Sequence, residues 1–284
     1  MKPAPFAYHR PESIEDMLDL LRDHGAEAKI LAGGQSLVPA MNFRLARPGI
    51  ILDANRLAAL ETIWAEAGTV RIGALVRHAA FHAPVADAPL GPLLTRVAHH
   101  IAHYPIRQRG TFGGSLAHAD PASEWCLVAT VLDAEMTVRS AAKTRMIPAN
   151  AFFKGTFTTD LRPDELLTEI RLPLLDSAWR GGFNEFSRRA GDFALAMALA
   201  LLRIDGGRIT AARLGIGGVA DKAIRLGALE QRLVSQAPTG DLFETIARAA
   251  AESITPSEDI HASPAFRRDL IRAVVKRALR EAIA

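Results

Sequence analysis

Two short segments combine paired glycines with hydroxyl side chains, a pattern that suits phosphate binding. The first is Ala32-Gly33-Gly34-Gln35-Ser36-Leu37, and the second is Thr111-Phe112-Gly113-Gly114-Ser115-Leu116. Glycine allows backbone conformations that a Cβ would forbid, and consecutive exposed N–H groups form a concavity that binds anions. We expect two loops that hold a single diphosphate from both sides, which makes a dinucleotide the natural ligand. The alternative interpretation is that both segments are ordinary turns.

Other nucleotide-binding and catalytic signatures are missing from the sequence. No G-x-G-x-x-G follows the first predicted strand and no G-K-[ST] occurs, so neither Rossmann nor P-loop binding is indicated. The nucleophile motif G-x-S-x-G of many hydrolases is also absent. The run of glycines at 215–218 is interpreted as the end of a strand. A protein whose organic cofactor performs redox chemistry fits these observations better than a hydrolase.

Two carboxylates follow the second glycine segment. Asp120 and Glu124 are four residues apart, and a helix that starts near Pro121 would place them on neighbouring faces. Glu124 would then reach back toward the glycines. Carboxylates at this place suit the ribose or ribityl hydroxyls of a dinucleotide, although Asp120 could equally serve only as a helix cap.

Histidines and the single cysteine offer weaker chemistry. His99 and His103 would share one face of a predicted helix, with His100 and His118 nearby, but the glutamate of a zinc hydrolase is missing and we expect no metal site. Cys126 lies in an apolar run and is interpreted as a buried, unreactive thiol. One cysteine excludes an internal disulfide and a cysteine-ligated cluster built from this chain alone.

Composition indicates a globular protein. The 284 residues are 49% hydrophobic, and the formal net charge of +3 is spread among alternating acidic and basic residues, which argues against nucleic-acid binding. No apolar stretch approaches the ~20 residues that span a bilayer. The N-terminal residues lack the apolar core of a secretion signal, so a cytoplasmic location is expected.

Periodicity divides the chain into three parts. Ser13 begins a capping box, and Gly25 is expected to end the helix that follows it. We predict a first α/β unit at 1–57, an antiparallel sheet with helices at 58–176 and a C-terminal part at 177–284. Further helices are expected at 37–45, 93–103, 241–253 and 265–282, strands at 29–31, 50–53, 69–73, 136–139 and 169–172, and either two strands or a strand and a helix at 194–204 and 208–215. The fold class is therefore α+β.

Three ordered motifs carry a resemblance to a known family. AGGQSL at 32–37, IRQRGTFGGSLAHADPASE at 106–124 and FSRRAGDFALA at 186–196 resemble the FAD-binding medium subunit of molybdenum hydroxylases, the group that includes carbon monoxide dehydrogenase and xanthine dehydrogenase. The similarity covers nearly the whole chain. It implies a two-part FAD-binding region of the vanillyl-alcohol-oxidase-like (PCMH) type, followed by a C-terminal antiparallel sheet with helices.

The resemblance also implies a set of cofactor-binding residues. Residues 32–37 and 111–115 would wrap the FAD pyrophosphate, while Asp120 and Glu124 would approach the sugar or ribityl part. The full implied set is Lys29, Leu31, Ala32, Gly33, Gly34, Gln35, Ser36, Leu37, Ala102, Ile106, Thr111, Gly113, Gly114, Ser115, Ala117, Asp120, Glu124, Leu166, Leu167 and Phe193. Within it, Lys29 would lie on the adenine side and Phe193 near the isoalloxazine ring.

The chain departs from the family pattern at two places. Relatives often carry a lysine near Asn184-Glu185, where its charge would steady the flavin, and here Arg188 or Arg189 would have to replace it. The proline usual after 217–220 is also absent. Neither departure touches the glycine segments.

By resemblance, the chain would be one subunit of a larger enzyme. It would take electrons from two [2Fe–2S] clusters on a small partner subunit and pass them through FAD to an external acceptor, with molybdopterin on a large subunit. A dimer of such heterotrimers is expected. Two alternatives remain: a self-sufficient flavin oxidoreductase of the same superfamily, and an assembly subunit without a cofactor.

Overall fold

The N-terminal part of the chain forms a three-stranded parallel sheet in the order β1-β3-β2 in the computed structural model, which describes residues 1–284. Its elements are β1 (Ala7–His9), α1 (Ile14–His24), β2 (Ala28–Leu31), α2 (Leu37–Asn42) and β3 (Ile50–Asp53). The Ser13 hydroxyl caps α1 by accepting a hydrogen bond from the Asp16 N–H, as the capping box predicts. Met17, Leu18 and Leu21 are buried in a small core that holds this layer together.

The middle part of the chain forms a five-stranded antiparallel sheet in the order β4-β5-β10-β6-β7. These strands are β4 (Ile63–Glu66), β5 (Thr69–Gly73), β6 (Glu135–Arg139), β7 (Thr144–Pro148) and β10 (Leu166–Pro173), and a separate short hairpin joins β8 (Phe153–Gly155) to β9 (Thr158–Thr159). The long strand β10 pairs with β5 on one side and β6 on the other. The chain between β5 and β10 is more than 90 residues long and includes most helices of this part, so the central strand of the sheet is added last.

The helices of the middle part pack together beside this sheet. They are η1 (Ala58–Leu60), η2 (His78–His82), α3 (Leu90–His100), α4 (Tyr104–Arg107), α5 (Phe112–His118), α6 (Glu124–Val131) and α7 (Ala149–Phe152). Helix α6 is apolar around its circumference and is buried at Trp125 through Ala129. The Trp125 ring lies 4.7 Å from the Phe112 ring and 4.9 Å from the Phe81 ring, which joins α6 to α5 and η2.

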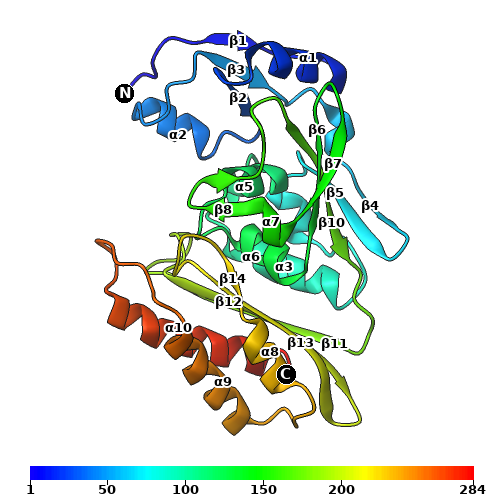
Figure 1. Ribbon diagram of the computed structural model, residues 1–284, viewed down its shortest axis with the longest axis vertical. Helices are drawn as coiled ribbons and strands as arrows, with labels where there is room; N and C mark the ends of the chain where they lie inside the picture. Colours follow the sequence, from blue (N-terminus) through cyan, green and yellow to red (C-terminus); the bar gives the residue numbers. More distant parts are fainter.

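The C-terminal part forms a four-stranded antiparallel sheet that lies between two helical layers (Figure 1). Its elements are β11 (Trp179–Phe186), β12 (Ala196–Asp205), β13 (Arg208–Gly217), β14 (Ile224–Arg225), α8 (Gly227–Leu233), α9 (Gly240–Ser253) and α10 (Pro264–Glu281). Strand β12 is buried on both faces: Met197, Leu199 and Leu201 join the core of the middle part, whereas Ala198 and Ala200 belong to the core with α9 and α10. A continuous apolar run is typical of such a central strand.

The α+β class and the predicted order of sheets are confirmed, and the structure decides between the alternatives left open for two segments. Both segments at 194–204 and 208–215 are strands. The helix expected at 93–103 spans Leu90–His100 instead, because Ile101 is extended, with φ −66° and ψ 105°, and Ala102 then adopts a left-handed φ of 43°. Since the second and third parts share one core cluster, they are not independent in packing, and the limits of the three domains stay a prediction. None of the helices has the length and apolar character needed to cross a bilayer.

Candidate functional site

The first glycine segment turns the chain from β2 into α2 and leaves its amides available. Gly34 has a φ of +73°, a conformation that suits glycine. The backbone N–H groups of Gly33, Gly34, Gln35 and Ser36 donate no hydrogen bond within the chain, and the Ser36 side chain makes no capping bond to α2. Four successive free donors and a free hydroxyl form a concavity for an anion, as the sequence predicts.

The second glycine segment is the first turn of helix α5, not the loop that we expected. Thr111 caps this helix by accepting a hydrogen bond from the Gly114 N–H at 3.1 Å, and the Gly113 N–H donates to the Ala74 carbonyl at 3.0 Å. A Cβ on Gly113 would stand 2.6 Å from the Ala74 Cα. These glycines therefore let α5 pack against the end of β5, and their amides are already occupied. The Thr111 N–H makes no hydrogen bond within the chain.

The two segments lie against each other. A Cβ on Gly33 would stand 2.2 Å from the Arg109 carbonyl oxygen and 2.6 Å from the Gly110 Cα. A Cβ on Gly114 would lie 3.8 Å from the Ala32 Cβ. The free amides of the first segment thus border the capped helix start of the second, at the junction between the N-terminal and middle parts of the fold.

Two side chains that the sequence analysis missed tie this junction together. Asn55 Nδ2 donates to the Ala32 carbonyl at 2.9 Å, and Asn55 Oδ1 accepts from Arg77 Nη2 at 2.7 Å. Arg77 Nη1 in turn donates to the Arg109 carbonyl. The chain of bonds runs from the first glycine segment to Arg109, two residues before the second. The sequence signal that could have found Asn55 was an amide side chain two residues after the predicted strand at 50–53.

The short helix α4 precedes Arg109 and packs against the segment between β11 and β12. Arg107 Nη1 donates to the Ala102 carbonyl at 2.8 Å, which fixes the left-handed turn before α4, where Ile106 lies half-buried. A Cβ on Gly191, whose φ is +85°, would meet the His103 ring at 2.4 Å. The segment that carries Phe193 therefore packs on α4, and the Phe193 ring is 73% exposed.

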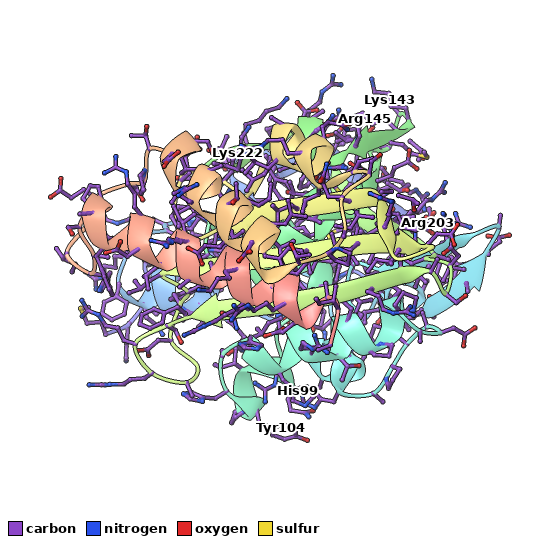
Figure 2. The ribbon with its side chains drawn as sticks, turned by 90° about the horizontal axis from the view of Figure 1, so that it is seen from below. His99, Tyr104, Lys143, Arg145, Arg203 and Lys222 are labelled. Atoms are coloured by element: carbon purple, nitrogen blue, oxygen red, sulfur yellow. The ribbon has the colours of Figure 1, made fainter.

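The histidines near α4 do not form the helix face that the sequence suggested. Because α3 ends at His100, His99 and His103 do not share a helix. His99 stacks on His82 with a ring distance of 5.1 Å, and Tyr104 lies 5.6 Å from the same ring. Figure 2 shows His99 and Tyr104 together at one edge of the molecule.

Glu124 is the first residue of α6, so the expected helix start near Pro121 is wrong. Asp120 lies in the preceding turn, where its Oδ1 accepts the Ala122 N–H at 2.9 Å. Asp120 therefore does not cap α6, whose N-cap position is Ser123; its carboxylate stabilises the turn before the helix. Burial, followed by the nearby Asp120 charge, raises the pKa of Glu124 to about 7.

Glu185 on β11 has a still stronger shift. Burial first and the Glu124 carboxylate second raise the pKa of Glu185 to about 9. Arg188, one of the two candidates for the missing positive charge, donates to the His261 carbonyl of the segment before α10, and both Arg188 and Arg189 are exposed.

The remaining predicted residues lie partly on the surface and partly in the protein core. Lys29 and Ala117 are exposed, and Leu31 ends β2 beside the first glycine segment. Leu166 and Leu167 are buried on β10, near α5, with exposed fractions of 3% and 5%. Their side chains contribute to the protein core.

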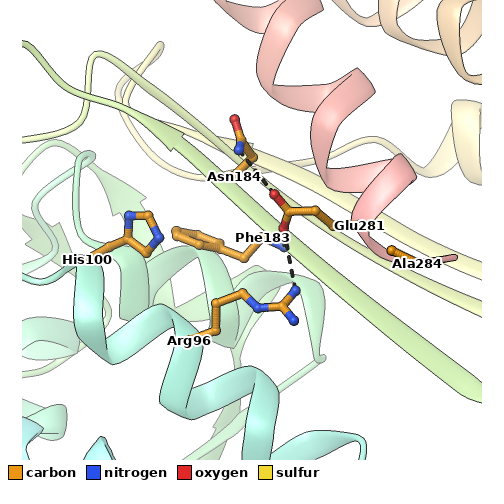
Figure 3. Close-up of a pocket in the computed structure, with 6 residues that line it drawn as sticks. All are labelled: Arg96, His100, Phe183, Asn184, Glu281 and Ala284. Atoms are coloured by element: carbon orange, nitrogen blue, oxygen red, sulfur yellow. Dashed lines mark hydrogen bonds and ion pairs between the residues drawn. The ribbon is translucent and has the colours of Figure 1, made fainter.

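A separate pocket of about 410 Å³ lies between α3, β11 and α10 (Figure 3). Its floor is organised by Glu281, whose carboxylate accepts from the Phe183 N–H at 3.2 Å and from Asn184 Nδ2 at 3.3 Å and pairs with Arg96 at 3.4 Å. None of the predicted cofactor-binding residues lines it.

Comparison with known proteins assigns both halves of the chain. Residues 4–175 match the family described as the FAD binding domain in molybdopterin dehydrogenase, and residues 182–282 match the CO dehydrogenase flavoprotein C-terminal domain.

Similar proteins match over their whole length. The alpha subunit of the 6-hydroxypseudooxynicotine dehydrogenase complex of Paenarthrobacter nicotinovorans is 39% identical, with 100% of this chain and 96% of the relative aligned. The nicotine 6-hydroxylase medium subunit of the same organism is 37% identical, with 99% of each chain aligned. A structure of carbon monoxide dehydrogenase from Hydrogenophaga pseudoflava superposes with a TM-score of 0.95 at 34% identity, covering 100% of this chain and 99% of the other.

Proposed function

We propose that this chain, which belongs to the family of FAD-binding medium subunits of the molybdenum hydroxylases, binds one FAD without a covalent link and connects [2Fe–2S] clusters of a partner chain to an external electron acceptor. The observation that carries the proposal is the close approach of Gly33 to Arg109. It brings four unpaired backbone donors and the start of α5 to one place.

The residues at this junction fit a diphosphate. The N–H groups of residues 33–36 and the Ser36 hydroxyl would meet the phosphate oxygens, with the Thr111 N–H on the opposite side. Gly113 and Gly114 would act differently from our first expectation, because their occupied amides leave them to shape the site by close packing. FAD, when bound, supplies the electron-carrying chemistry that no side chain here offers.

The other predicted residues would contact the parts of FAD outside the diphosphate. Lys29 and Leu31 would lie toward the adenine end, and Ala102, Ile106 and Ala117 would line the cofactor. Asp120 and Glu124 would face hydroxyl groups. The main chain at Leu166 and Leu167 would approach the flavin, since their side chains are committed to the core. The exposed Phe193 ring has the freedom to cover it.

We propose a small iron–sulfur subunit and a large molybdopterin subunit as partners, assembled as a dimer of heterotrimers in the cytoplasm. The single, buried Cys126 supports a partner for the clusters, because a [2Fe–2S] centre requires about four ligands, usually thiolates. Co-purification of the chain with its companions, followed by metal analysis, tests the assembly.

A flavin titration of the purified full chain tests cofactor binding. The fluorescence of FAD should be quenched on binding, with a stoichiometry of one FAD per chain. FMN, which lacks the diphosphate, should bind at least about tenfold more weakly, because hydrogen bonds to a charged group contribute about 1.5–3 kcal/mol. Equal affinity for the two flavins would contradict a site built on the diphosphate. No uptake of either flavin would favour an assembly subunit without a cofactor. Turnover by the chain alone would favour a self-sufficient oxidoreductase.

A further inference from the structure

His78 is a buried histidine beside the second glycine segment, with an exposed fraction of 4%. Trp125 Nε1, on α6, donates a hydrogen bond to His78 Nδ1 at 3.0 Å, and both side chains are buried. An indole N–H can only donate, so Nδ1 is the acceptor and carries no hydrogen. The His78 ring is therefore neutral with its hydrogen on Nε2. A second proton, on Nδ1, would break the bond from Trp125.

The surroundings of the ring keep it in this neutral form. Burial first, and then the nearby charges of Arg107 and Arg77, lower the pKa of His78 to about 3. Arg107 belongs to α4, and Arg77 directly precedes His78 in the chain. Both charges are positive, so each of them opposes a proton on the ring. His78 thus keeps one tautomer throughout the neutral pH range.

The backbone of His78 fixes the residues that lead into α5. The His78 N–H donates to the Gly110 carbonyl at 3.0 Å, next to an antiparallel bridge between Arg77 and Thr111. Arg77 and Thr111 exchange no hydrogen bond with each other. In such a pair, the N–H group of each residue points away from the opposite strand. This arrangement leaves the Thr111 N–H unpaired and directed away from Arg77.

The His78 ring also occupies the place that a side chain on Gly110 would need. A Cβ on Gly110 would lie 2.6 Å from His78 Nε2 and 2.7 Å from His78 Cδ2. The Gly110 Cα in turn lies 2.6 Å from the position of a Cβ on Gly33. Gly110 is therefore in close contact with both the His78 ring and the first glycine segment, directly before the unpaired Thr111 N–H.

We propose that His78 is a positioning residue of the FAD site: the bond from Trp125 fixes its ring as the neutral Nε2–H tautomer, and His78 holds Gly110 so that the Thr111 N–H faces the diphosphate. The identity of the ligand rests on the proposed function. His78 acts through the backbone and is not itself a cofactor ligand. Because its ring takes no second proton near neutral pH, the position of Gly110 does not change with pH through this residue.

Nitrogen-15 NMR of the full chain with labelled histidine tests the tautomer without any cofactor. The His78 signals, identified by their loss in His78→Asn, should show a hydrogen on Nε2 and none on Nδ1, with no change between pH 5 and 8. Free histidine in the same buffer, which titrates near pH ~6.5, provides the reference. A hydrogen on Nδ1, or a titration of His78 within this range, overturns the fixed tautomer.

Flavin titration of His78→Asn tests the positioning role. Asparagine keeps an acceptor for the Trp125 N–H but lacks the ring that contacts Gly110, so the fold should survive. FAD affinity should fall about tenfold, whereas the affinity for riboflavin, which has no phosphate group, should not change. His24→Asn, at an exposed histidine of α1, is the matched control. Equal losses for both flavins would show that His78 supports only the fold, and unchanged FAD affinity would also overturn the proposal.

Gly110→Ala tests the same contact from the glycine. The added methyl group would stand 2.6 Å from His78 Nε2, so FAD affinity should again fall about tenfold relative to riboflavin. Gly227→Ala is its control, because a Cβ there has nothing within 4 Å. FAD affinity equal to that of the control would overturn the role of this contact. If the unmodified chain takes up no FAD, the proposed function fails and the role in FAD binding with it, while the NMR measurement still decides the tautomer.

Discussion

The Arg109 carbonyl oxygen occupies the space that a side chain on Gly33 would need, 2.2 Å from the ideal Cβ position. This contact joins the N-terminal parallel sheet to the helical middle part. It also sets how far the free amides at residues 33–36 stand from Thr111. The junction therefore depends on the absence of one methyl group.

Replacement of Gly33 by alanine should disrupt the junction. The added Cβ meets backbone atoms that cannot rotate away, so we expect a loss of about 1–3 kcal/mol in stability and an FAD affinity at least about tenfold lower. Gly227→Ala is the control, because a Cβ there has nothing within 4 Å. Thermal unfolding and FAD titration measure the two effects. Unchanged FAD affinity in Gly33→Ala would show that the junction is not part of the FAD-binding site.

Truncation of Asn55 to alanine should loosen the tie between the glycine segments. The substitution frees the Ala32 carbonyl and the Arg77 guanidinium, and each lost bond contributes about 0.5–1.5 kcal/mol. We expect FAD to bind roughly tenfold more weakly, chiefly through faster dissociation. Asn150→Ala, at an exposed position of α7, should behave as the unmodified chain. Stopped-flow displacement of FAD measures the dissociation rate. Equal dissociation rates in both variants would contradict a role of the Asn55 hydrogen bonds in FAD binding.

Stability should fall as the pH rises because of Glu185. Its folded-state pKa of about 9 exceeds the ordinary value of 4.5, so above pH 4.5 the unfolded chain releases a proton that the folded chain retains. The stability that this proton confers is complete at low pH and is lost as the pH rises toward 9, by at most about 1.4 kcal/mol per pH unit.

Glu185→Gln should flatten this slope between pH 5 and 9, because an amide has no proton to lose. Denaturant unfolding at several pH values, with Glu252→Gln at an exposed position of α9 as the control, measures the difference. Parallel stability curves for all three proteins would show that Glu185 is ionised at neutral pH.

Cys126 should resist thiol reagents in the folded protein. Burial raises the pKa of its thiol to about 12, which leaves almost no thiolate at pH 8, and the sulfur is enclosed between α5 and α6. A chromogenic disulfide reagent should react with one thiol per chain only after denaturant is added. Stoichiometric reaction within minutes under native conditions would contradict the buried position.

The sequence by itself determined the local elements and the chemistry of the first glycine segment. The capping box at Ser13, the strand at 50–53 and the C-terminal helices follow from capping and periodicity, which are properties of neighbouring residues. Gly33 and Gly34 predicted a turn with exposed amides, and the turn has them. The motifs also identified the family, because they depend on order along the chain.

Only the tertiary structure decided which amides remain free and which distant side chains meet. Gly113 and Gly114 look like Gly33 and Gly34 in sequence, yet their N–H groups are occupied because Ala74 and the Thr111 hydroxyl lie against them. Arg77 donates to Asn55, 22 positions away in the sequence, and to the Arg109 carbonyl, 32 positions away. Such contacts arise from packing of separate layers, and local periodicity carries no information about them.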